Sequence, residues 1–535
     1  MPIESSIESP TETGTAAEQS AVASRPEPRT GERAAAGHDA PASLVALCQE
    51  LEDDKVVYCR WSARLGLEGD RAPEDDVQLL VSRAHMHRVT ALLARLGFKR
   101  ATARPQSAVP EALESYTYDP GADGLIRIRA QHHLLLGHEL TRNYRLPIES
   151  QCLSSAAPRD GLFRAPAPEY ELIVFVLQVL LRHSALDIVR GSASLARASE
   201  RLAELRARVD PDRVHEITKR DLPFLGAGVF EDCLEALQPA ASAWQQLKAR
   251  LGLISRLRAY ARRAPAIDTA LRMWRGAALA VRERIVGRSA GRRLNTGGAI
   301  IAIVGGDGAG KSTVVDALGA WLSRDFATTS VHLGKPRWSW TTTTVRGTLK
   351  LGQYLGLYSG ETSFRETLRR RSLVSMGYPW LLREVCRARD RWAIYVGARR
   401  FAAAGGLVVS DRFPLPQIQL MDGPQARRFL NELPDRRRGE AFLTPHRQDP
   451  LARALMELEE RYYQHLVSPE VLIVLRVDPD IAVQRRTGED LATVRERSTE
   501  IWHLDWQHTG ARVIDAGKPK AEVLAQAKAF VWSQL

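Results

Sequence analysis

The spacing of hydrophobic and polar positions changes along the 535-residue chain. Residues 1–40 are rich in Glu, Ser, Thr, Ala, Pro and Gly without any apolar period, which predicts a disordered tail. Over residues 41–165, short apolar runs alternate with helical patterns and predict a small α+β domain. Its expected elements are a helix over Leu44–Glu52, strands over Lys55–Cys59 and Val77–Val81, a helix over Arg83–Leu96 and a strand over Leu125–Arg129.

Helical periodicity then dominates residues 166–296, where Glu169–Leu181 is the most apolar stretch and is expected to be a buried helix. Beyond it, residues 297–535 alternate apolar runs with helical patterns, as in a βα series. The expected strands are Ile300–Val304, Gly406–Phe413, Val471–Val477 and Ala511–Ile514. The predicted fold class is α/β: a parallel sheet with flanking helices, preceded by the smaller α+β domain and a helical connector.

The connector is dense in arginine between residues 250 and 293, and Arg288–Gly298 is expected to link it to the last domain. Among these arginines are Arg256, Arg258, Arg262, Arg263, Arg272, Arg275, Arg282 and Arg284. A solvated helical connector is the first interpretation, and an amphipathic helix that contacts an anionic membrane surface or an acidic partner is the alternative. Aromatic residues are sparse here, which argues against a groove for nucleic acid.

The whole-chain composition sets wider limits. The net charge of +12 suits anionic or phosphorylated ligands but does not define a fold. The longest apolar stretch, Leu172–Leu181, is far shorter than the ~20 residues of a membrane span, and the acidic N-terminus does not resemble a secretory signal, so a cytoplasmic protein is expected. The five cysteines lack metal-binding spacing and are expected to be reduced.

The clearest motif is GGDGAGKS, which fits GxxxxGK[ST] between an expected strand and an expected helix. Glycines allow backbone amides to converge on a phosphate, Lys311 supplies a point charge to the β/γ oxygens, and the Ser312 hydroxyl can reach Mg²⁺. The helix dipole adds to the attraction for an anion. The predicted nucleotide-binding residues are Gly305, Gly306, Asp307, Gly308, Ala309, Gly310, Lys311, Ser312 and Thr313.

Two further strands carry charged residues at or after their carboxyl ends, the edge of an α/β sheet where ligands bind. Asp411 is expected to order Mg²⁺ or its water, and Arg412 to neutralise an acceptor phosphate; a surface salt bridge is the alternative. After Val471–Val477, several arginines lie on a predicted helix-turn-helix segment that could act as a lid over the transferred phosphoryl group. They are Arg485, Arg486, Arg495 and Arg497, each with a solvated charged helix as the alternative.

Together, GGDGAGKST, the SDRF strand end, VLRVDPDIAVQRR with its arginine-bearing lid, and VIDAG resemble the thymidylate kinase group of P-loop nucleoside-monophosphate kinases. The resemblance covers most of residues 298–535. It implies that Lys311 and Ser312 bind ATP with Mg²⁺ and that Asp307 and Arg412 approach the acceptor nucleotide. It also implies that Arg485 or Arg486, with Arg495, belongs to the lid.

The sequence departs from that group on the acceptor side. HLGKPRWSW, residues 332–340, stands where such kinases carry an Arg-Glu-Pro turn, and PLPQIQLMDGP follows Phe413 where they carry a serine-rich stretch. An arginine-rich insertion spans Thr341–Arg400. The expected function is therefore an ATP-dependent phosphotransferase acting on a phosphorylated small molecule, with dTMP as the first candidate. A non-nucleotide acceptor, or an ATP-binding regulatory or scaffolding protein with little turnover, is the alternative.

The N-terminal unit resembles nucleotidyltransferase-like domains through KVVYCRWSARLGLEGDRAPEDDVQLLV followed by a helix and LGFKRA. Such enzymes need a D-x-D pair and a third acid on a neighbouring strand to hold two metal ions. Here Gln78 stands two positions after Asp76, where the second acid of the pair is needed, and the later strand is Ile-Arg-Ile-Arg, so a degenerate binding or scaffolding domain is expected; Asp75 with Asp76 is the fallback pair. The histidines of QHHLLLGHE, residues 131–139, lack metal-ligand spacing and are expected to be structural.

Overall fold

A computed structural model describes the chain over fourteen ranges. They are residues 40–61, 76–102, 112–159, 161–184, 187–188, 193–286, 291–334, 336, 338–355, 378–418, 420–421, 423–424 and 450–485, with 491–535 completing the C-terminus. The expected tail of residues 1–39, Asp75 and Arg486 lie outside these ranges. Residues Ala40–Leu535 cluster as one unit by their contacts.

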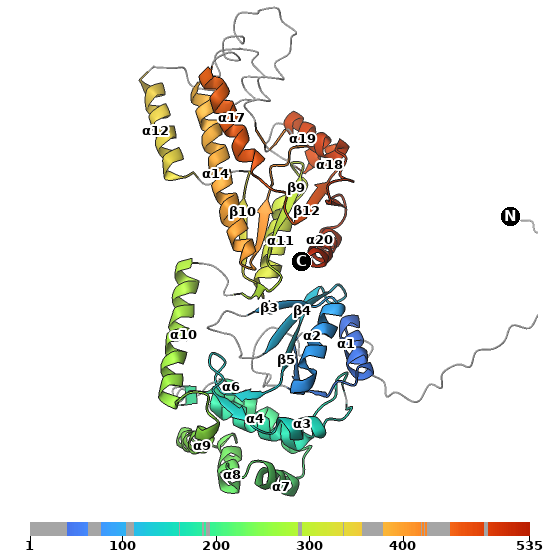
Figure 1. The fold of residues 1–535 in the computed structure, drawn as a ribbon, viewed down its shortest axis with the longest axis vertical. Coiled ribbons are helices and arrows are strands. Elements are labelled where there is room, and N and C mark those ends of the chain that lie inside the picture. Colours follow the sequence, from blue (N-terminus) through green and yellow to red (C-terminus); the bar gives the residue numbers. More distant parts are fainter. Residues whose placement is uncertain are drawn as a thin grey trace, which may run out of the picture. The chain divides into compact units, whose positions relative to one another are not determined.

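The C-terminal sheet has five strands in the order β10-β11-β9-β12-β13 (Figure 1). Neighbouring strands are parallel throughout. The strands are β9 (Ala299–Gly305), β10 (Thr328–His332), β11 (Leu407–Asp411), β12 (Val471–Arg476) and β13 (Arg512–Asp515). β9, which leads into the glycine-rich loop, lies at the centre of the sheet, so the loop emerges at its carboxyl edge.

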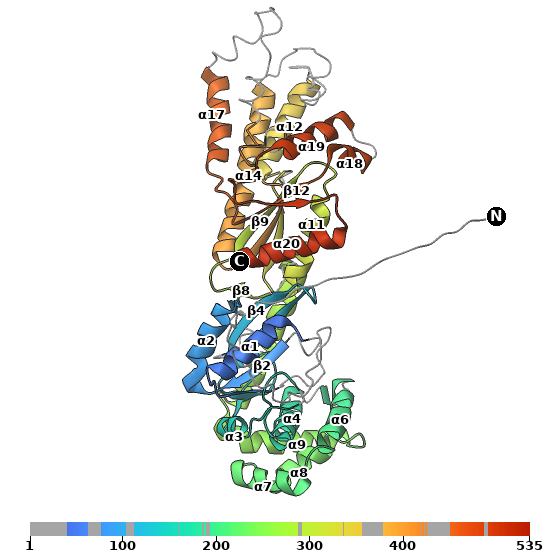
Figure 2. The same ribbon diagram turned by 90° about the vertical axis from the view of Figure 1, so that its right-hand side faces the viewer.

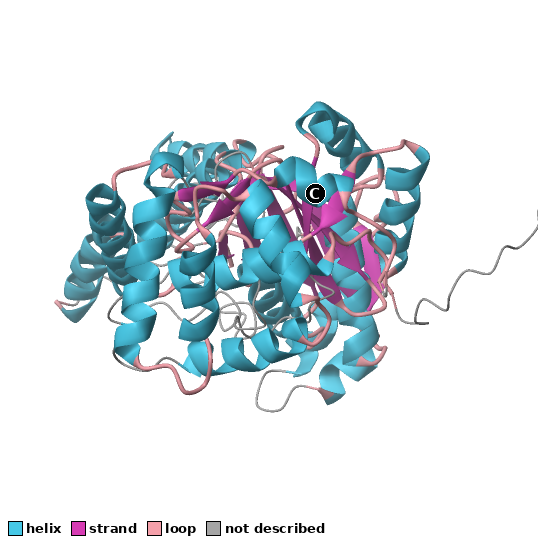
Figure 3. Ribbon diagram, turned by 90° about the horizontal axis from the view of Figure 1, so that it is seen from below, coloured by secondary structure: helices cyan, strands magenta, loops and turns pink. Residues whose placement is uncertain are grey.

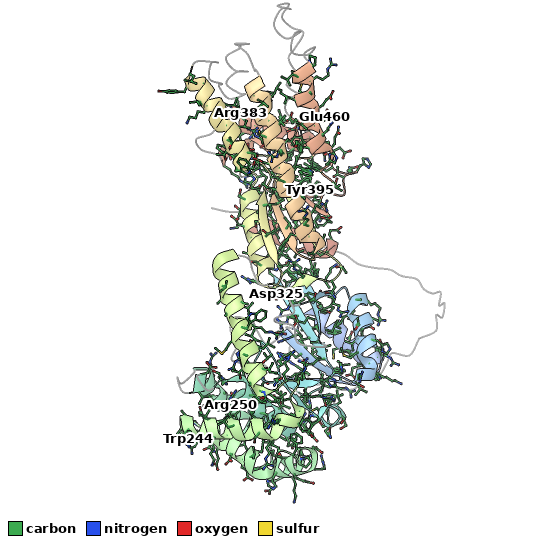
Figure 4. The ribbon with its side chains drawn as sticks, turned by 60° about the vertical axis from the view of Figure 1, so that its left-hand side comes forward. Trp244, Arg250, Asp325, Arg383, Tyr395 and Glu460 are labelled. Carbon is green, nitrogen blue, oxygen red and sulfur yellow. The ribbon has the colours of Figure 1, made fainter. Side chains whose placement is uncertain are left out.

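Helices cover both faces of this sheet, as the near-continuous apolar strands require. The helices are α11 (Lys311–Ser323), α12 (Trp340–Tyr354), α14 (Tyr378–Ala403), α17 (Pro450–Gln464), α18 (Pro479–Gln484), α19 (Leu491–His503) and α20 (Lys520–Gln534). Leu318 of α11 and Val531 of α20 pack on the face that carries Ile301. Tyr395 of α14 and Ile501 of α19 pack on the opposite face (Figures 2 and 4). The mixed α/β class with a parallel sheet is confirmed.

The N-terminal sheet has six strands in the order β1-β2-β5-β4-β3-β8. They are β1 (Tyr58–Arg60), β2 (Asp76–Val81), β3 (Lys99–Thr102), β4 (Leu113–Asp119), β5 (Gly124–Gln131) and β8 (Arg293–Leu294). β2 and β5 run parallel, and the other neighbours are antiparallel. One face packs on α1 (Ala42–Asp53) and α2 (Met86–Arg95), through residues such as Val77, Leu92 and Ile128.

A helical bundle and a short hairpin follow this sheet. They comprise β6 (Leu134–Leu136), β7 (Tyr144–Leu146), α3 (Glu149–Ser154), α4 (Pro168–Arg182), α6 (Ala193–Arg206), α7 (Pro211–Asp221), α8 (Ala227–Ala236), α9 (Ala243–Arg256) and α10 (Pro265–Val286). Every residue of α4 from Glu169 to Leu181 is buried except Glu171, in accord with its apolar sequence. Figure 3 shows helices and strands in separate colours, with helices making up much of the chain.

Some side chains in and beside the arginine-rich connector anchor it to the rest of the domain, whereas others are exposed to solvent. Arg250 Nε donates to the carbonyl of His183 at 2.9 Å, and Arg275 donates to the carbonyl of Leu140. Trp244 is 72% exposed and Trp274 is 60% exposed (Figure 4). The described residues contain no helix long and apolar enough to cross a membrane. Contact of this segment with an anionic surface stays a prediction.

Three strands of the N-terminal sheet were not expected from the sequence. β3 and β4 were not predicted, and the expected linker Arg288–Gly298 contains β8. β8 pairs with β3 on one side, while the Leu294 amide donates to the carbonyl of Gly405 on the other. β8 is too short to show a period, and its partner β3 lies about 190 residues earlier in the chain, so no local pattern reveals this strand.

An aromatic cluster joins the N-terminal sheet to the segment that follows α11. Tyr116 of β4 meets Phe326 with ring centroids 5.0 Å apart, and Tyr118 meets Trp321 at 5.4 Å. Trp532 of α20 packs against Phe326 at 5.9 Å. Rings at such edge-on or tilted angles add to the hydrophobic stabilisation of their burial. The C-terminal end of α11 is therefore held against the N-terminal sheet.

We expect Phe326→Ala to lower the free energy of unfolding by about 3–5 kcal/mol, because Phe326 is fully buried between Tyr116 and Trp532 and truncation leaves a cavity. The matched control is Trp244→Ala, which removes an exposed ring and should change the same quantity by less than about 0.5 kcal/mol. Urea denaturation followed by circular dichroism measures both. Equal, small effects would show that the aromatic cluster does not stabilise the protein.

Candidate functional site

The glycine-rich loop between β9 and α11 has the backbone geometry of a tight turn that opens a helix. Gly308 and Gly310 have positive φ angles of 85° and 81°, a region that residues with a Cβ rarely adopt. Gly310 is the N-cap of α11. The first backbone N–H groups of that helix therefore have no acceptor within the helix and point toward the loop. The loop therefore presents backbone donors at a helix N-terminus, the arrangement that binds phosphate.

Two glycines are also required by close packing against α18 and α19, the helices of the predicted lid. A Cβ on Gly306 would lie 2.6 Å from the hydroxyl oxygen of Ser498 in α19. A Cβ on Gly308 would lie 2.8 Å from the carbonyl oxygen of Ala482 in α18. α18 and α19 thus press directly on the loop and bring the side chains of the lid segment within its reach.

Lys311 begins α11 with its side chain folded back over the loop. Its ammonium donates to the carbonyl oxygens of Gly305 at 3.0 Å and Gly306 at 2.7 Å, and the residue is 7% exposed. A buried ammonium needs such partners because desolvation disfavours its charge. The same ammonium lies at the loop, where a phosphate oxygen could replace these carbonyls.

Three positively charged side chains from different segments of the chain surround the Asp307 carboxylate. Its carboxylate accepts hydrogen bonds from Arg412 Nη2 at 3.1 Å and Arg497 Nη1 at 2.6 Å, and Lys311 Nζ lies 3.8 Å away. Burial alone would raise the pKa of Asp307, but the hydrogen bond from Arg497 and the charges of these neighbours hold it below its usual value. The carboxylate is therefore ionised at neutral pH and fixes the arginines beside the loop.

Arg412 is held in a strained conformation at the end of β11. Its φ of 64° is unusual for a residue with a side chain, and strain of this kind persists where surrounding contacts fix the backbone. The Arg412 amide donates to the carbonyl of Ile303, and its carbonyl accepts from the Ser410 hydroxyl. A Cβ on Gly334 would lie 2.5 Å from Arg412 Cδ, so this glycine lets the arginine side chain pass toward Asp307.

Asp411 and Ser312 meet at the carboxyl edge of the sheet. The Ser312 hydroxyl lies 3.5 Å from Asp411 Oδ2, and His332 Nε2 lies 3.9 Å from the same oxygen. Asp411 Oδ1 is buried and has no hydrogen-bond partner within the described structure. A carboxylate oxygen without a partner beside a hydroxyl fits a hard cation such as Mg²⁺, which takes oxygen ligands.

The four lid arginines noted in the sequence have different surroundings. Arg485 Nη1 donates to the carbonyl of Ala516 at 2.9 Å, and Arg495 forms an exposed ion pair with Asp480 at 2.6 Å. Arg497 reaches the loop through Asp307. Arg486 lies outside the described residues. In this structure, Arg497 is the lid arginine that joins the site, whereas Arg495 points elsewhere.

The helical periodicity of α19 explains why Arg497 reaches Asp307 and Arg495 does not. Val494, Ser498 and Ile501 are the buried stripe of α19, and the Ser498 hydroxyl donates to the carbonyl of Asp307. Arg497 lies beside this stripe and Arg495 does not. The 3.6-residue period would have selected Arg497 from the sequence, whereas its pairing with Asp307 carries no sequence signal because 190 residues separate them.

The turn that follows β10 is where the sequence predicts the acceptor side. Arg391 of α14 is buried and donates to the carbonyls of Leu333 at 2.7 Å and Gly334 at 2.9 Å. It also contacts the hydroxyl of Tyr463 in α17. The neighbouring Asp390 accepts from the Ser339 amide at 3.2 Å. The segment that departs from thymidylate kinases is thus fixed by residues of the arginine-rich insertion.

The N-terminal domain carries the histidines of residues 131–139, which the sequence predicts to be structural. His133 lies 3.1 Å from a Glu149 oxygen, and burial lowers the pKa of His138 to about 4. Among the described residues, no group of three or more His, Cys, Asp or Glu side chains could hold a metal ion. The resemblance to nucleotidyltransferases stays a prediction.

We expect Gly306→Ala to weaken the packing of α19 on the loop and to lower the free energy of unfolding by about 1–3 kcal/mol, since the new methyl group would overlap Ser498. Gly347→Ala is the matched control: it lies in the exposed helix α12 with nothing within 4 Å of the added methyl, and alanine is the better helix former. Thermal denaturation compares the two. A stability loss in Gly347→Ala but not in Gly306→Ala would contradict this packing.

We expect Asp307→Asn to lower the free energy of unfolding at pH 7 by about 3 kcal/mol, because it leaves Arg412, Arg497 and Lys311 without their shared carboxylate. The pKa of Asp307 is lower in the folded than in the unfolded chain, so its contribution is complete above about pH 4 and lost as the pH falls through the folded-state value. Urea denaturation of both proteins from pH 7 to pH 3 tests this. A difference that stays constant or grows toward pH 3 would exclude the assignment.

Comparisons with known proteins give distant similarities. No protein-family model matches the chain. The chain is 26% identical over 260 residues to "Uncharacterized ATP-binding protein YghR" of Escherichia coli strain K12, an alignment that covers 43% of this chain and 86% of that protein. The protein of the same name from Escherichia coli O6:H1 gives the same values.

Among solved structures, the thymidylate kinase from Candida albicans is similar over 44% of this chain and 92% of its own length, with 18% sequence identity and a TM-score of 0.28. The chain is thus a mixed α/β protein with a glycine-rich loop at the edge of a parallel sheet, distantly similar to an uncharacterised bacterial protein described as ATP-binding.

Proposed function

We propose that this protein is an ATP-dependent phosphotransferase of the nucleoside-monophosphate kinase type. The observation that carries the proposal is the convergence of Lys311, Arg412 and Arg497 on Asp307 at the N-terminus of α11. Phosphoryl transfer needs little covalent chemistry from a protein and depends on positioning and on neutralising charge. Three cations fixed beside a phosphate-binding loop provide both.

ATP is the proposed donor. The loop amides and the α11 N-terminus bind its β- and γ-phosphates, and Lys311 exchanges the carbonyls of Gly305 and Gly306 for phosphate oxygens. The remaining loop residues shape the backbone, and Thr313 lies in the first turn of α11. The description of YghR as ATP-binding supports this part of the proposal.

Ser312 and Asp411 are the proposed holders of Mg²⁺, through the serine hydroxyl and the carboxylate whose Oδ1 has no hydrogen-bond partner in the described structure. When bound, the ion would neutralise charge on the transferred phosphate. His332 lies close enough to Asp411 to orient its carboxylate. These residues gather at the β11 edge, directly beside the loop.

The acceptor phosphate approaches from the side of Arg412. One of its oxygens attacks the γ-phosphorus, the bond from that phosphorus to the β–γ bridging oxygen breaks, and ADP leaves. A phosphate monoester is largely dianionic at pH 7, so the attacking oxygen needs no general base. Arg412 neutralises the acceptor, and Arg497 stabilises the transferred group once it releases Asp307. Arg485 holds the lid base to Ala516, while Arg486 and Arg495 are lid arginines expected from the sequence.

The acceptor itself is proposed as a class: a phosphorylated small molecule, with dTMP as the first candidate to test. The turn after β10 would face it, and Arg391 fixes that turn by two backbone carbonyls. Because this turn and PLPQIQLMDGP differ from the thymidylate kinase pattern, an acceptor with another base, or a non-nucleotide phosphate, is included in the same proposal.

A nucleotide-responsive regulatory protein is the second candidate function. It is favoured by one observation: α11 begins at the phosphate loop and ends three residues before Phe326, which packs against β4 of the N-terminal sheet. A change at the loop can therefore reach that sheet through one helix. Such a protein would bind ATP with little turnover.

We expect purified protein to release ADP from Mg-ATP only when a suitable acceptor is present, and we expect Lys311→Ala to remove this activity. Nucleoside monophosphates, including dTMP, and phosphorylated sugars form the acceptor panel, and coupled ADP detection gives the rate. Tight ATP binding without turnover on any acceptor would exclude the kinase and favour the regulatory protein.

A pair of variants in this assay separates the lid arginines. Arg497→Ala should lower kcat/KM by about 10³-fold if Arg497 stabilises the transferred group. Arg495→Ala removes an exposed ion pair 2 residues away and should leave kcat/KM within about twofold. The reverse order would assign the role to Arg495.

A further inference from the structure

One face of the N-terminal sheet is charged although it is buried. Ile126, Ile128 and Ala130 of β5 enter the apolar core beside α1 and α2, so the alternating residues face the other side. We call this other side the polar face. Its members from three adjacent strands are Asp76, Gln78, Glu114, Arg127, Arg129 and Gln131, each at most 8% exposed.

The strand register brings the charges together. Asp76 is the registered partner of Arg127 and Gln78 that of Arg129 in the parallel pair, while Glu114 is paired with Arg129 in the antiparallel one. Arg129 Nη2 lies 2.9 Å from Asp76 Oδ2, and Arg127 Nε lies 3.6 Å from Asp76 Oδ1. Neighbouring strands thus build one cluster instead of separate ion pairs.

Arginine and carboxylate side chains from several elements share this cluster. Arg127 also lies 4.0 Å from Glu114, and Glu114 is paired with Arg292 from the segment before β8. The charge of the buried Asp325 acts on Arg292 as well. The charge of Arg142, in the loop after β6, also reaches Arg129: burial lowers the pKa of Arg129 to about 10, and the charges of Arg127 and Arg142 contribute to this shift. Buried guanidinium groups are costly unless partners surround them.

The solvent still reaches the cationic members of the cluster. The Asp76 side chain is fully buried, whereas the side chains of Arg127 and Arg129 are 8% and 10% exposed. An approaching ligand would therefore meet guanidinium groups before carboxylates. This is the reverse of a metal site, where carboxylate oxygens face the ion.

Buried donors without acceptors accompany these charges. Within the described structure, Gln131 Nε2 and Thr141 Oγ1 have no hydrogen-bond partner, and Arg127 Nε has the ion pair with Asp76 at 3.6 Å but no hydrogen bond. Gln131 shares the face of Arg127 and Arg129, and Thr141 directly precedes Arg142 in sequence. An amide or hydroxyl donor without an acceptor is costly when buried, and a ligand that offers acceptors satisfies it.

We propose that the polar face of the N-terminal sheet binds a phosphate group, held by Arg127 and Arg129 and by donors from Gln131 and Thr141. A phosphate supplies several acceptor oxygens with at least one negative charge, and guanidinium groups bind it bidentately. The group is either inorganic phosphate or the phosphate of a small organic molecule. This site is separate from the glycine-rich loop and does not depend on the kinase activity.

The experiment uses full-length Lys311→Ala, in which the glycine-rich loop has lost its phosphate-binding lysine. Isothermal titration calorimetry measures its binding of inorganic phosphate and of ribose 5-phosphate. We expect saturable binding of at least one probe. Tighter binding of the monoester would identify an organic phosphate, and tighter binding of the free ion would identify inorganic phosphate. Absence of saturable binding for both probes would overturn the proposal.

Gln131→Leu and Thr141→Val, each added to Lys311→Ala, test the donors without touching the Asp76 ion pairs. Each should weaken binding about tenfold, since each removes a hydrogen bond to a charged group. Thr348→Val on the exposed surface of α12 is the matched control and should leave binding unchanged. Unchanged affinity in both donor variants would overturn the assignment of these residues.

Thermal denaturation without phosphate distinguishes this site from a purely structural network. A structural donor stabilises the ligand-free fold, so its removal would lower the melting temperature. At the proposed site, Gln131→Leu removes a buried donor that has no protein acceptor, and the ligand-free melting temperature should stay the same or rise. A clear fall, together with unchanged phosphate affinity, would show that Gln131 serves the fold alone.

Discussion

The ionised carboxylate of Asp307 is the interaction on which the C-terminal site depends. It is buried, and three cations of the described residues offset its desolvation. Those cations come from the start of α11, the end of β11 and the middle of α19, so one side chain ties the glycine-rich loop, the sheet edge and α19 together. In the proposed kinase, a phosphate that enters the loop would compete with Asp307 for the same cations. Phosphate binding would then be coupled by charge to the position of α19.

The glycines of the loop have a second role in this assembly. Gly308 and Gly310 supply the backbone angles, whereas Gly306 and Gly308 also leave room for α19 and α18. The motif GxxxxGK[ST] explains the first role from local sequence alone. The second depends on helices that begin more than 170 residues later. One short turn thus encodes a packing surface as well as the proposed phosphate site.

Sequence patterns predicted the parts of the fold whose signal is local. β9, α11, β11 and β12 follow from apolar runs and a helix start, and Lys311, Ser312, Asp411 and Arg412 lie together at one sheet edge as their positions after strands suggest. β4 was missed although LESYTYD alternates polar and aromatic residues as a half-buried strand does; in the structure both of its faces are buried. Its aromatic residues are covered by Trp321 and Phe326, and no local pattern reports partners so distant. For the same reason the sequence could not single out the pairing of Arg497 with Asp307.

The two proposed phosphate sites use different chemistry within one chain. The glycine-rich loop offers backbone amides and a helix dipole, whereas the polar face offers guanidinium groups fixed by carboxylates across strands. The loop site is formed by consecutive residues, so it can be recognised as a motif in the sequence. The polar-face site is assembled by the register of β2, β4 and β5, so no sequence motif marks it.

The contact between Tyr116 and Phe326 also bears on how the chain folds during synthesis. These residues are 210 positions apart. The strand β8, which pairs with the edge of the same sheet, is also synthesised long after β4. At about 5–20 residues per second, roughly 10–40 seconds separate the emergence of β4 from that of its covering ring. For that interval the nascent N-terminal sheet has an open edge and bare aromatic side chains, and it depends on chaperones or on its own charged residues to avoid pairing with other chains.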